Sequence, residues 1–461
     1  MRSRKKEAVD LLHGNITEQL LLFFFPVFFG TLFQQLYNTV DAVVVGNFVG
    51  TAALGAVGGS TGTLLNLLVG FVTGLSSGAT VVIAQYYGQN NRDGVRRSTS
   101  SGMFLAIVLG AVLTVVGILY APQLLGMLRV PEDMFEQAVI YLRIYFVGMV
   151  PTMVYNTGAG ILRAIGDSRR PLYFLIASAC TNIVLDILLV AVWPFGIAGA
   201  AWATVISQFV SSRLTMYVLS HTTQPVHFRY RDLSFEWPIL KRILAIGLPT
   251  GIQSALYSVA NLFIQASING FGTSTVAAYT AFGKIDALFW NASGSLGTAV
   301  LTFAGQNFGA GNIRRVRSGF YHAIGVYVVG ALGIIAACWF GGPYLFRLFT
   351  PDQQVISIGL SILRFLCPWW ITFCLVEVFS SGIRACGDSL IPMLITASGI
   401  GAFRILWIIF YPGSTIFDTL VCYPISWVLT SVLFVIYYLQ GGWLKRSLKL
   451  KEQVSGLENK R

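Results

Sequence analysis

The chain has 461 residues, of which 55% are hydrophobic and only 11% are charged, and its formal net charge is +12. This composition excludes an ordinary soluble domain, because apolar runs of about 18 residues or more recur along the whole chain. The basic residues are spread over short loops and tails with no basic domain to hold a nucleic-acid backbone, so they are better explained as a signal of membrane topology. We therefore predict a protein embedded in the lipid bilayer, with no nucleic-acid partner.

Twelve apolar runs can each cross a hydrocarbon layer of about 30 Å as a helix. They cover residues 16–45, 52–82, 98–120, 136–161, 171–193, 196–219, 239–267, 273–303, 318–340, 355–383, 389–411 and 416–440. The predicted fold class is all-α integral membrane, with twelve transmembrane helices.

The distribution of basic residues predicts the orientation of these helices, because short basic loops stay on the cytoplasmic side. Most of the 31 Lys and Arg residues lie in alternate loops and in the two tails, and only Arg129 and Arg347 lie in the opposite loops. Both termini are therefore predicted to be cytoplasmic.

The sequence also repeats itself. Residues 161–168 (ILRAIGDS) return 221 residues later as residues 382–389 (GIRACGDS), and the spacing of Pro26 and Asn38 returns as Pro249 and Asn261. Two related halves that each carry six spans share one topology, which is typical of transporters. The expected domains are an N-terminal segment (1–15), an N-lobe (16–220), an inter-lobe linker (221–238), a C-lobe (239–440) and a C-terminal tail (441–461).

Ionisable residues inside predicted spans are functional candidates, because they are costly in lipid. Asp41 lies in the first span and Asp186 in the fifth, with Asn182 one helical turn before Asp186. At about 1.5 Å per residue, Asp41 lies ~8 Å, Asp186 ~12 Å, Asn182 ~18 Å and Thr204 of the sixth span ~12 Å inside the outer ends of their helices. The four side chains can therefore converge in the outer half of the N-lobe.

Two carboxylates, an amide and a hydroxyl suit a hard cation such as sodium, or a proton shared between carboxylates that cannot both stay charged. The structural alternative is that Asp41 and Asp186 cap each other or bond to backbone groups between packed helices. A buried acidic pair with no positive partner in its lobe is expensive for that purpose.

The C-lobe has different chemistry, because the repeat offset aligns Asp41, Asn182 and Asp186 with the apolar residues Ile264, Phe403 and Trp407. The polar residues of its own spans include the following: Gln253, Asn261, Lys284, Asp286, Glu377 and Arg404. They are compatible with internal salt bridges and with a C-lobe polar site. No phosphate-binding loop motif occurs, so direct drive by ATP is not expected, and no cofactor is predicted.

Several motifs resemble those of multidrug and toxic compound extrusion (MATE) transporters, most closely the DinF-like branch. They are residues 37–46 (YNTVDAVVVG), 85–88 (QYYG), 162–167 (LRAIGD) and 305–311 (GQNFGAG), and the similarity covers almost the whole chain. The resemblance implies two six-helix lobes around a central cavity that opens alternately to the two sides while drugs are exported against a cation gradient.

The resemblance also implies a cation-coupling site at Asp41, Asn182, Asp186 and Thr204, the four residues selected by depth, and a bend of the first helix at Pro26. From the residues alone, Pro26 and its repeat partner Pro249 are compatible with a hinge or with a fixed kink. Other branches of the family place a Glu on the seventh span where this chain has Gln253, so a C-lobe cation site is not expected from the resemblance.

The predicted function is secondary active efflux of amphipathic or cationic organic compounds by proton or sodium antiport. We expect small drug-like substrates, a monomer, and a location in the plasma (inner) membrane. A lipid-linked saccharide flippase of the same superfamily is the alternative, but its pyrophosphate needs a basic cavity for which only Lys284, Arg364 and Arg404 are candidates. A membrane enzyme is not expected, because no catalytic His or Asp motif occurs.

Overall fold

The computed structural model describes residues 8–128, 130–411 and 413–458, so Arg129 and most of the basic N-terminus lie outside it, and every regular element that it describes is a helix. The first half contains α1 (Ile16–Phe48), α2 (Thr51–Gly58), α3 (Ser60–Gly88), α4 (Arg92–Met127), α5 (Glu132–Val147), α6 (Met149–Ala164), α7 (Arg169–Asp186), the π-helical η1 (Ile187–Val192), α8 (Gly196–His221) and the 3-10 helix η2 (Tyr230–Asp232). The second half contains α9 (Trp237–Ile268), the 3-10 helix η3 (Asn269–Phe271), α10 (Thr273–Gly309), α11 (Ile313–Arg347), α12 (Gln353–Leu366), the 3-10 helix η4 (Cys367–Phe373), α13 (Cys374–Ala385), α14 (Leu390–Thr396), the π-helical η5 (Ala397–Ala402), α15 (Phe403–Phe410), α16 (Ile416–Leu420), α17 (Cys422–Leu439) and α18 (Gly442–Glu458).

Each of the twelve predicted spans coincides with a helix or with an interrupted helical segment, which confirms the all-α membrane fold. Within the described residues, nine helices are long and apolar enough to cross a membrane, and α5 with α6, bent by 49° at their junction, make a tenth. The other two predicted spans are α8 and α10, which have 26 and 37 residues. They are long enough to span, but they carry more polar side chains, such as Gln208 in α8 and Lys284 and Asp286 in α10.

The helices form two compact units. Unit 1 comprises 1–10 and 25–251, and unit 2 comprises 11–24 and 252–461. These boundaries differ from the expected lobes, because α1 and α9 each contribute residues to both units. In α1 the division falls between Phe24 and Phe25, directly before Pro26. In α9 it falls between Gly251 and Ile252, just after Pro249.

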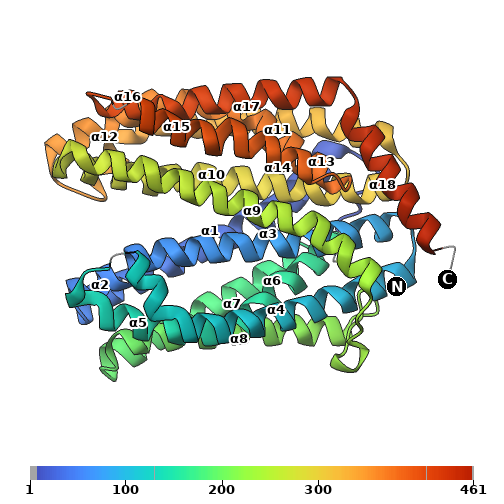
Figure 1. The fold of residues 1–461 in the computed structure, drawn as a ribbon, viewed down its shortest axis with the longest axis horizontal. Coiled ribbons are helices and arrows are strands. Elements are labelled where there is room, and N and C mark those ends of the chain that lie inside the picture. The colour runs from blue at the N-terminus through green and yellow to red at the C-terminus, as the bar shows by residue number, and fades with distance from the viewer. Residues whose placement is uncertain (1–7, 129, 412, 459–461) are drawn as a thin grey trace, which may run out of the picture. The chain divides into compact units, whose positions relative to one another are not determined.

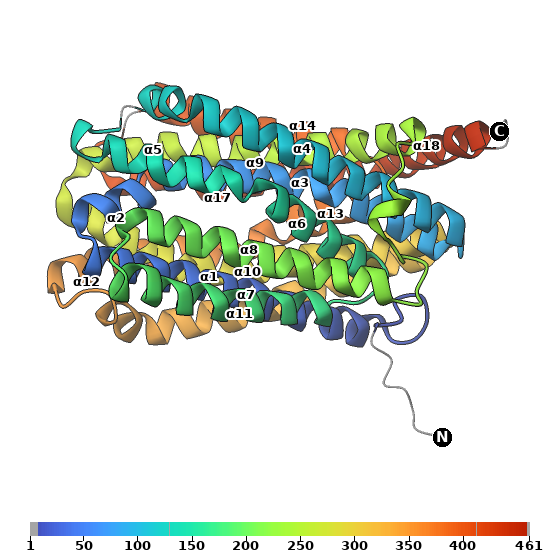
Figure 2. The same cartoon turned by 90° about the horizontal axis from the view of Figure 1, so that it is seen from below.

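Within each unit the long helices run roughly along a common direction (Figure 1 and Figure 2). In unit 1, α7 packs along α8, and α6 packs against α3, α4 and α8. The first part of α9 packs on α3 through two pairs of glycines with the same spacing, Gly74 and Gly78 on α3 and Gly247 and Gly251 on α9. A Cβ atom on Gly74 would lie 2.6 Å from the backbone of Gly251, so this contact requires small residues.

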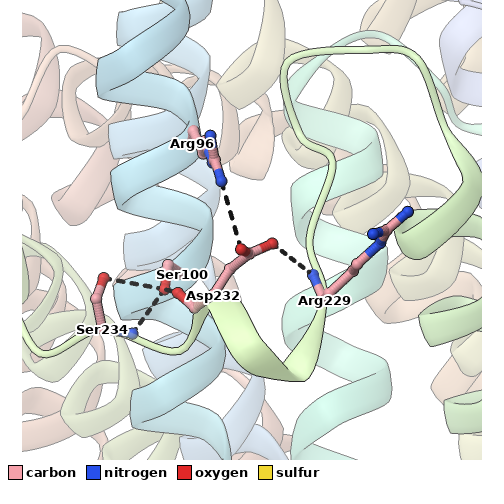
Figure 3. A network of polar contacts seen from close by, with 5 residues as sticks. All are labelled: Arg96, Ser100, Arg229, Asp232 and Ser234. Carbon is pink, nitrogen blue, oxygen red and sulfur yellow. Dashed lines mark hydrogen bonds and ion pairs between the residues drawn. The ribbon is translucent and has the colours of Figure 1, made fainter.

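The connection between α8 and α9 is fixed to α4 by polar contacts (Figure 3). Arg96 pairs with Asp232 at 3.4 Å, and the hydroxyl of Ser100 accepts hydrogen bonds from the backbone N–H and the hydroxyl of Ser234 at 2.8 and 3.0 Å. Nearby, Nε of Arg97 donates to Glu236 at 2.8 Å. The expected linker is therefore a docked part of unit 1, and it holds the start of α9 there.

The repeated motif of residues 161–168 and 382–389 forms the same turn in both units. Gly166 (φ 91°) and Gly387 (φ 103°) follow α6 and α13 in the left-handed region, where a helix commonly ends in glycine. The next residue is a buried aspartate in each case: Asp167 accepts a hydrogen bond from the N–H of Arg170 at 3.1 Å, and Asp388 accepts one from the hydroxyl of Tyr437 at 2.5 Å. The repeated motif of residues 161–168 and 382–389 therefore has a structural role, since it ends a helix and holds the turn that follows.

Unit 2 also includes the start of α1 and the C-terminal helix. The amide of Asn307 donates to the carbonyl of Leu11 at 3.0 Å, and Arg315 donates to the carbonyl of Gly14 at 3.1 Å. Trp443 of α18 is buried, and Lys451 donates to two carbonyls at the end of α10 at 3.2 Å. The predicted C-terminal tail thus begins as a helix docked on unit 2.

Candidate functional site

Asp41 lies in α1, within the part of the helix that belongs to unit 1. Its side chain is buried, with 8% of its surface exposed. Tyr37, which is also buried, lies one helical turn earlier on the same face. Pro26 lies fifteen residues before Asp41 in the same continuous helix.

Asn182 and Asp186 lie in the last turns of α7, and both are completely buried. The helix changes to π-helical geometry directly after Asp186, over Ile187–Val192. Short π-helical segments inside α-helices are rare, and they occur frequently at functional sites. The local backbone thus changes at the position of the second carboxylate.

Thr204 lies in α8, which packs along α7, and its side chain is buried with 7% exposed. Its hydroxyl donates to the carbonyl of Ala200 at 3.1 Å, so its lone pairs can still accept from, or bind, another group. The neighbouring contact from the hydroxyl of Ser178 to the carbonyl of Ser207, at 2.8 Å, ties the two helices together beside the site.

The polar atoms of the cluster are largely unsatisfied. Among the described residues, no hydrogen-bond partner exists for Oδ1 of Asp41, for either side-chain oxygen of Asp186 or for either polar side-chain atom of Asn182. Asp41 and Asp186 lie near enough to interact electrostatically, and no Lys, Arg or His in this part of the chain pairs with either of them within 4.0 Å. Buried polar groups are normally paired, so this cluster has the donor set of a cation or proton site.

The structure adds residues to this cluster that sequence reasoning missed. The side chains of Gln34 and Gln208 lie beside the hydroxyl of Tyr37. Tyr141 of α5 lies close enough to both carboxylates to interact with them electrostatically. The spacing of four residues from Asp41 could have identified Tyr37. Nothing in the sequence around Tyr141 sets it apart from other buried aromatic residues.

Direct contacts do not join all six polar residues considered for the C-lobe into one cluster. Arg404 is buried and contacts the exposed Asn261, with 3.5 Å between Nη1 and Oδ1. Asp286 instead accepts a hydrogen bond from Nε1 of Trp290 at 2.7 Å, and Lys284 is exposed on α10.

Glu377 belongs to another group in unit 2. It accepts a hydrogen bond from the hydroxyl of Ser381 at 3.3 Å, and that hydroxyl accepts one from Arg384 at 3.2 Å. Gln253 lies beside Tyr257, and both Glu377 and Arg404 are near enough to Tyr257 for their charges to act on its hydroxyl. Direct contacts therefore divide the polar residues of unit 2 into small clusters, and the charge of Arg404 links them at longer range through Asp286 and Tyr257.

Large aromatic residues fill the space between these clusters. Phe289 stacks on Trp370 with 4.6 Å between ring centroids, and Trp290 packs edge-on against Phe373 at 4.8 Å. Trp370 is fully buried. These rings pack the interior of unit 2.

The fold and the buried polar cluster define a polytopic membrane protein of the transporter class, built from two related halves. A family model described as MatE matches residues 26–188 and 249–409, one segment in each half. The chain therefore belongs to the MATE family, whose members are transporters and not enzymes.

Relatives with known descriptions align over nearly the whole chain. A probable multidrug resistance protein, YpnP from Bacillus subtilis, is 29% identical over 452 residues, which cover 96% of this chain and 99% of the relative. A probable multidrug resistance protein, NorM from Thermotoga maritima, is 25% identical over 453 residues, covering 96% of each chain. A FAD transporter from Shewanella oneidensis is 25% identical over 389 residues, covering 82% of this chain and 84% of the relative.

Solved structures share the fold. A MOP superfamily transporter from Pyrococcus furiosus matches with a TM-score of 0.88 and 24% identity, covering 97% of this chain and all of the other. The outward-facing conformation of a multidrug resistance MATE family transporter matches with a TM-score of 0.87 and 23% identity over the same shares.

Proposed function

We propose that this protein is a multidrug efflux transporter that exports amphipathic or cationic organic compounds in exchange for protons or sodium ions. The relatives described as multidrug resistance proteins support export of drug-like compounds. We further propose that it acts as a monomer in the plasma membrane, with both termini in the cytoplasm, as the distribution of basic residues favours.

The unsatisfied acidic cluster of unit 1 carries this proposal. Two carboxylates in a site shielded from water cannot both stay ionised without a compensating cation. A proton on one carboxylate removes one charge and supplies a donor to the other. A sodium ion would be held by oxygens of Asp41, Asp186, Asn182 and Thr204, and hard cations prefer such oxygen ligands.

Coupling requires that the cation and the exported compound favour different states of the protein. The cation brings Asp41 on α1 together with Asp186 on α7 by neutralising their repulsion. Release of the cation restores that repulsion. Pro26 removes one backbone hydrogen bond from α1, so the helix can bend there at low cost when Asp41 changes its partner.

Transport by purified protein in liposomes tests this function. Ethidium movement is followed under an imposed pH gradient and then under an imposed sodium gradient, for wild type and for Asp41→Asn. We expect wild type to move ethidium under one of the two gradients and Asp41→Asn to lose that movement. Gradient-driven transport that persists in Asp41→Asn would refute the site.

A further inference from the structure

Arg404 is a buried cation in unit 2 that no carboxylate neutralises by direct contact. Only 3% of its surface is exposed. Within the described chain, no Asp or Glu oxygen lies within 4.0 Å of its guanidinium nitrogens. Asp286 interacts electrostatically with Arg404 from a greater distance, and Oδ2 of Asp286 accepts a hydrogen bond from Trp290. A buried charge without a paired counter-ion is costly and demands an explanation.

The surroundings of Arg404 orient its guanidinium but do not saturate it. Nε donates to the hydroxyl of Ser426 at 2.9 Å, and Nη1 reaches Asn261 at 3.5 Å. The ring of Tyr423 lies 4.2 Å from Cζ and covers one face of the guanidinium. These contacts leave Nη2 with no hydrogen-bond partner among the residues the structure describes. Asn261 is exposed, so this side of the cluster reaches the surface of the protein.

The cluster lies on the spans of its half that correspond to those of the acidic cluster in the other half. Asn261, Arg404 and Ser426 lie on the first, fifth and sixth spans of the C-lobe. With the repeat offset of 221 residues, Arg404 corresponds to Ile183, next to Asn182, and Ser426 corresponds to Val205, next to Thr204. The same three spans therefore build an acidic site in one half and a basic site in the other.

We propose that the cluster of Arg404, Asn261, Ser426 and Tyr423 binds an oxyanion, a carboxylate or a phosphate group. A guanidinium with free N–H donors and a fixed plane is suited to such groups, and a charge-assisted contact is stronger than a neutral one. Tyr423 and Tyr279, whose hydroxyls are 3.0 Å apart, add hydroxyl groups beside it. Resting on the proposed efflux function, this assigns amphipathic compounds with an anionic group, zwitterions included, to the substrates.

Binding of a matched pair of dyes tests the proposal. Rhodamine B carries a free carboxylate, whereas its ethyl ester keeps the cationic ring system without that charge. Fluorescence anisotropy of each dye is measured with the full-length protein in a neutral detergent. We expect Arg404→Gln to weaken binding of rhodamine B by about tenfold or more, to change binding of the ester by less than about twofold, and Arg404→Lys to keep part of the preference.

Two variants test the charge without removing Arg404. Asn261→Asp places a carboxylate next to the guanidinium and should abolish the preference for rhodamine B, because the site then contains its own anion. Asp286→Asn removes a negative charge near the site and should increase that preference. Arg364→Gln is the matched control. Arg364 also lies over an aromatic ring, with 6.0 Å between its Cζ and the centroid of Trp339, but its side chain is exposed. This variant should leave the preference for rhodamine B unchanged.

The source of the oxyanion is distinguished by adding lipid to the same assay. If phosphatidylglycerol, but not phosphatidylcholine, displaces rhodamine B from wild type and not from Arg404→Gln, a lipid phosphate fills the site. If neither lipid displaces the dye, the site serves the transported compound. In either case the oxyanion site stands.

Equal binding of the two dyes by wild type, or an equal loss of both in Arg404→Gln, would overturn the proposal and leave Arg404 as a packing residue. The binding assay uses no ion gradient. A failure of ion-coupled efflux would therefore be seen in the liposome experiment and not here.

Discussion

Adding one methyl group at Gly78 should separate α3 from the first part of α9. A Cβ atom there would lie 2.2 Å from the carbonyl oxygen of Ile243 and 2.8 Å from the backbone nitrogen of Gly247. Ordinary contacts of this kind begin at 3.4 Å, so the helices must move apart by about 1.2 Å. Both obstructing atoms belong to the backbone, and no side-chain rotation can relieve the clash.

The expected cost follows from two opposing effects. Forcing a well-packed interface apart costs about 1 to 3 kcal/mol, whereas replacing glycine by alanine within a helix gains up to about 1 kcal/mol. Gly78→Ala should therefore be destabilising overall. Gly294→Ala in α10 is the matched control, because a Cβ atom at Gly294 meets no atom within 4 Å. It should leave stability unchanged or increase it slightly.

Thermal unfolding of the detergent-purified variants measures this difference. We expect the midpoint of Gly78→Ala to fall below those of wild type and Gly294→Ala, and ion-driven transport to fall with it, because the start of α9 must stay on α3. A midpoint for Gly78→Ala equal to that of Gly294→Ala would show that this helix contact is not as close as the structure indicates.

Three further changes test other parts of the account. Pro26→Ala should restore a backbone hydrogen bond in α1, so thermal stability should be kept or raised while gradient-driven transport falls; unchanged transport would rule out a hinge there. Ser100→Ala removes the hydroxyl that accepts a hydrogen bond from the backbone N–H of Ser234, and it should lower the free energy of unfolding by about 1 to 2 kcal/mol. Glu236→Gln breaks a partly exposed ion pair and should lower it by less than about 1 kcal/mol. The reverse order in thermal unfolding would contradict the role given to the docked linker. Asp186→Asn should lose ion-driven ethidium transport as Asp41→Asn does, and a fully coupled Asp186→Asn would remove α7 from the site.

Much of the architecture could be predicted from the sequence, because the properties that set it are local. Apolar runs located the spans, and the repeated motif revealed the two halves. Helix periodicity and depth also selected Asp41, Asn182, Asp186 and Thr204, all of which are buried in unit 1. The sequence could not predict to which unit the two parts of α1 and α9 belong. The first part of α9 belongs to unit 1 because it contacts α3 and because the docked linker holds it there.

Contacts between residues that are far apart in the chain could also not be predicted from the sequence. Tyr141 joins the acidic cluster from α5, and Tyr423 and Ser426 surround Arg404 from α17, without any motif that marks them. The polar residues of the C-lobe looked alike in the sequence, as isolated ionisable groups in apolar helices. Their neighbours distinguish them, because Asp286 accepts a hydrogen bond from Trp290, while Arg404 has no counter-ion within 4.0 Å in the part of the chain that the structure describes.

The most direct test of the central claim is to let the exported compound drive the ion. Coupling between two ligands is reciprocal, so an ethidium gradient imposed on proteoliposomes, with no pH or sodium gradient, must move the coupling ion in the opposite direction. Proton movement is followed with a pH-sensitive dye enclosed in the liposomes, and sodium movement with radioactive sodium. The account predicts opposite movement of one of these ions with wild type and none with Asp41→Asn. Ethidium that crosses with no counter-movement of either ion, or ion movement that persists in Asp41→Asn, would contradict it.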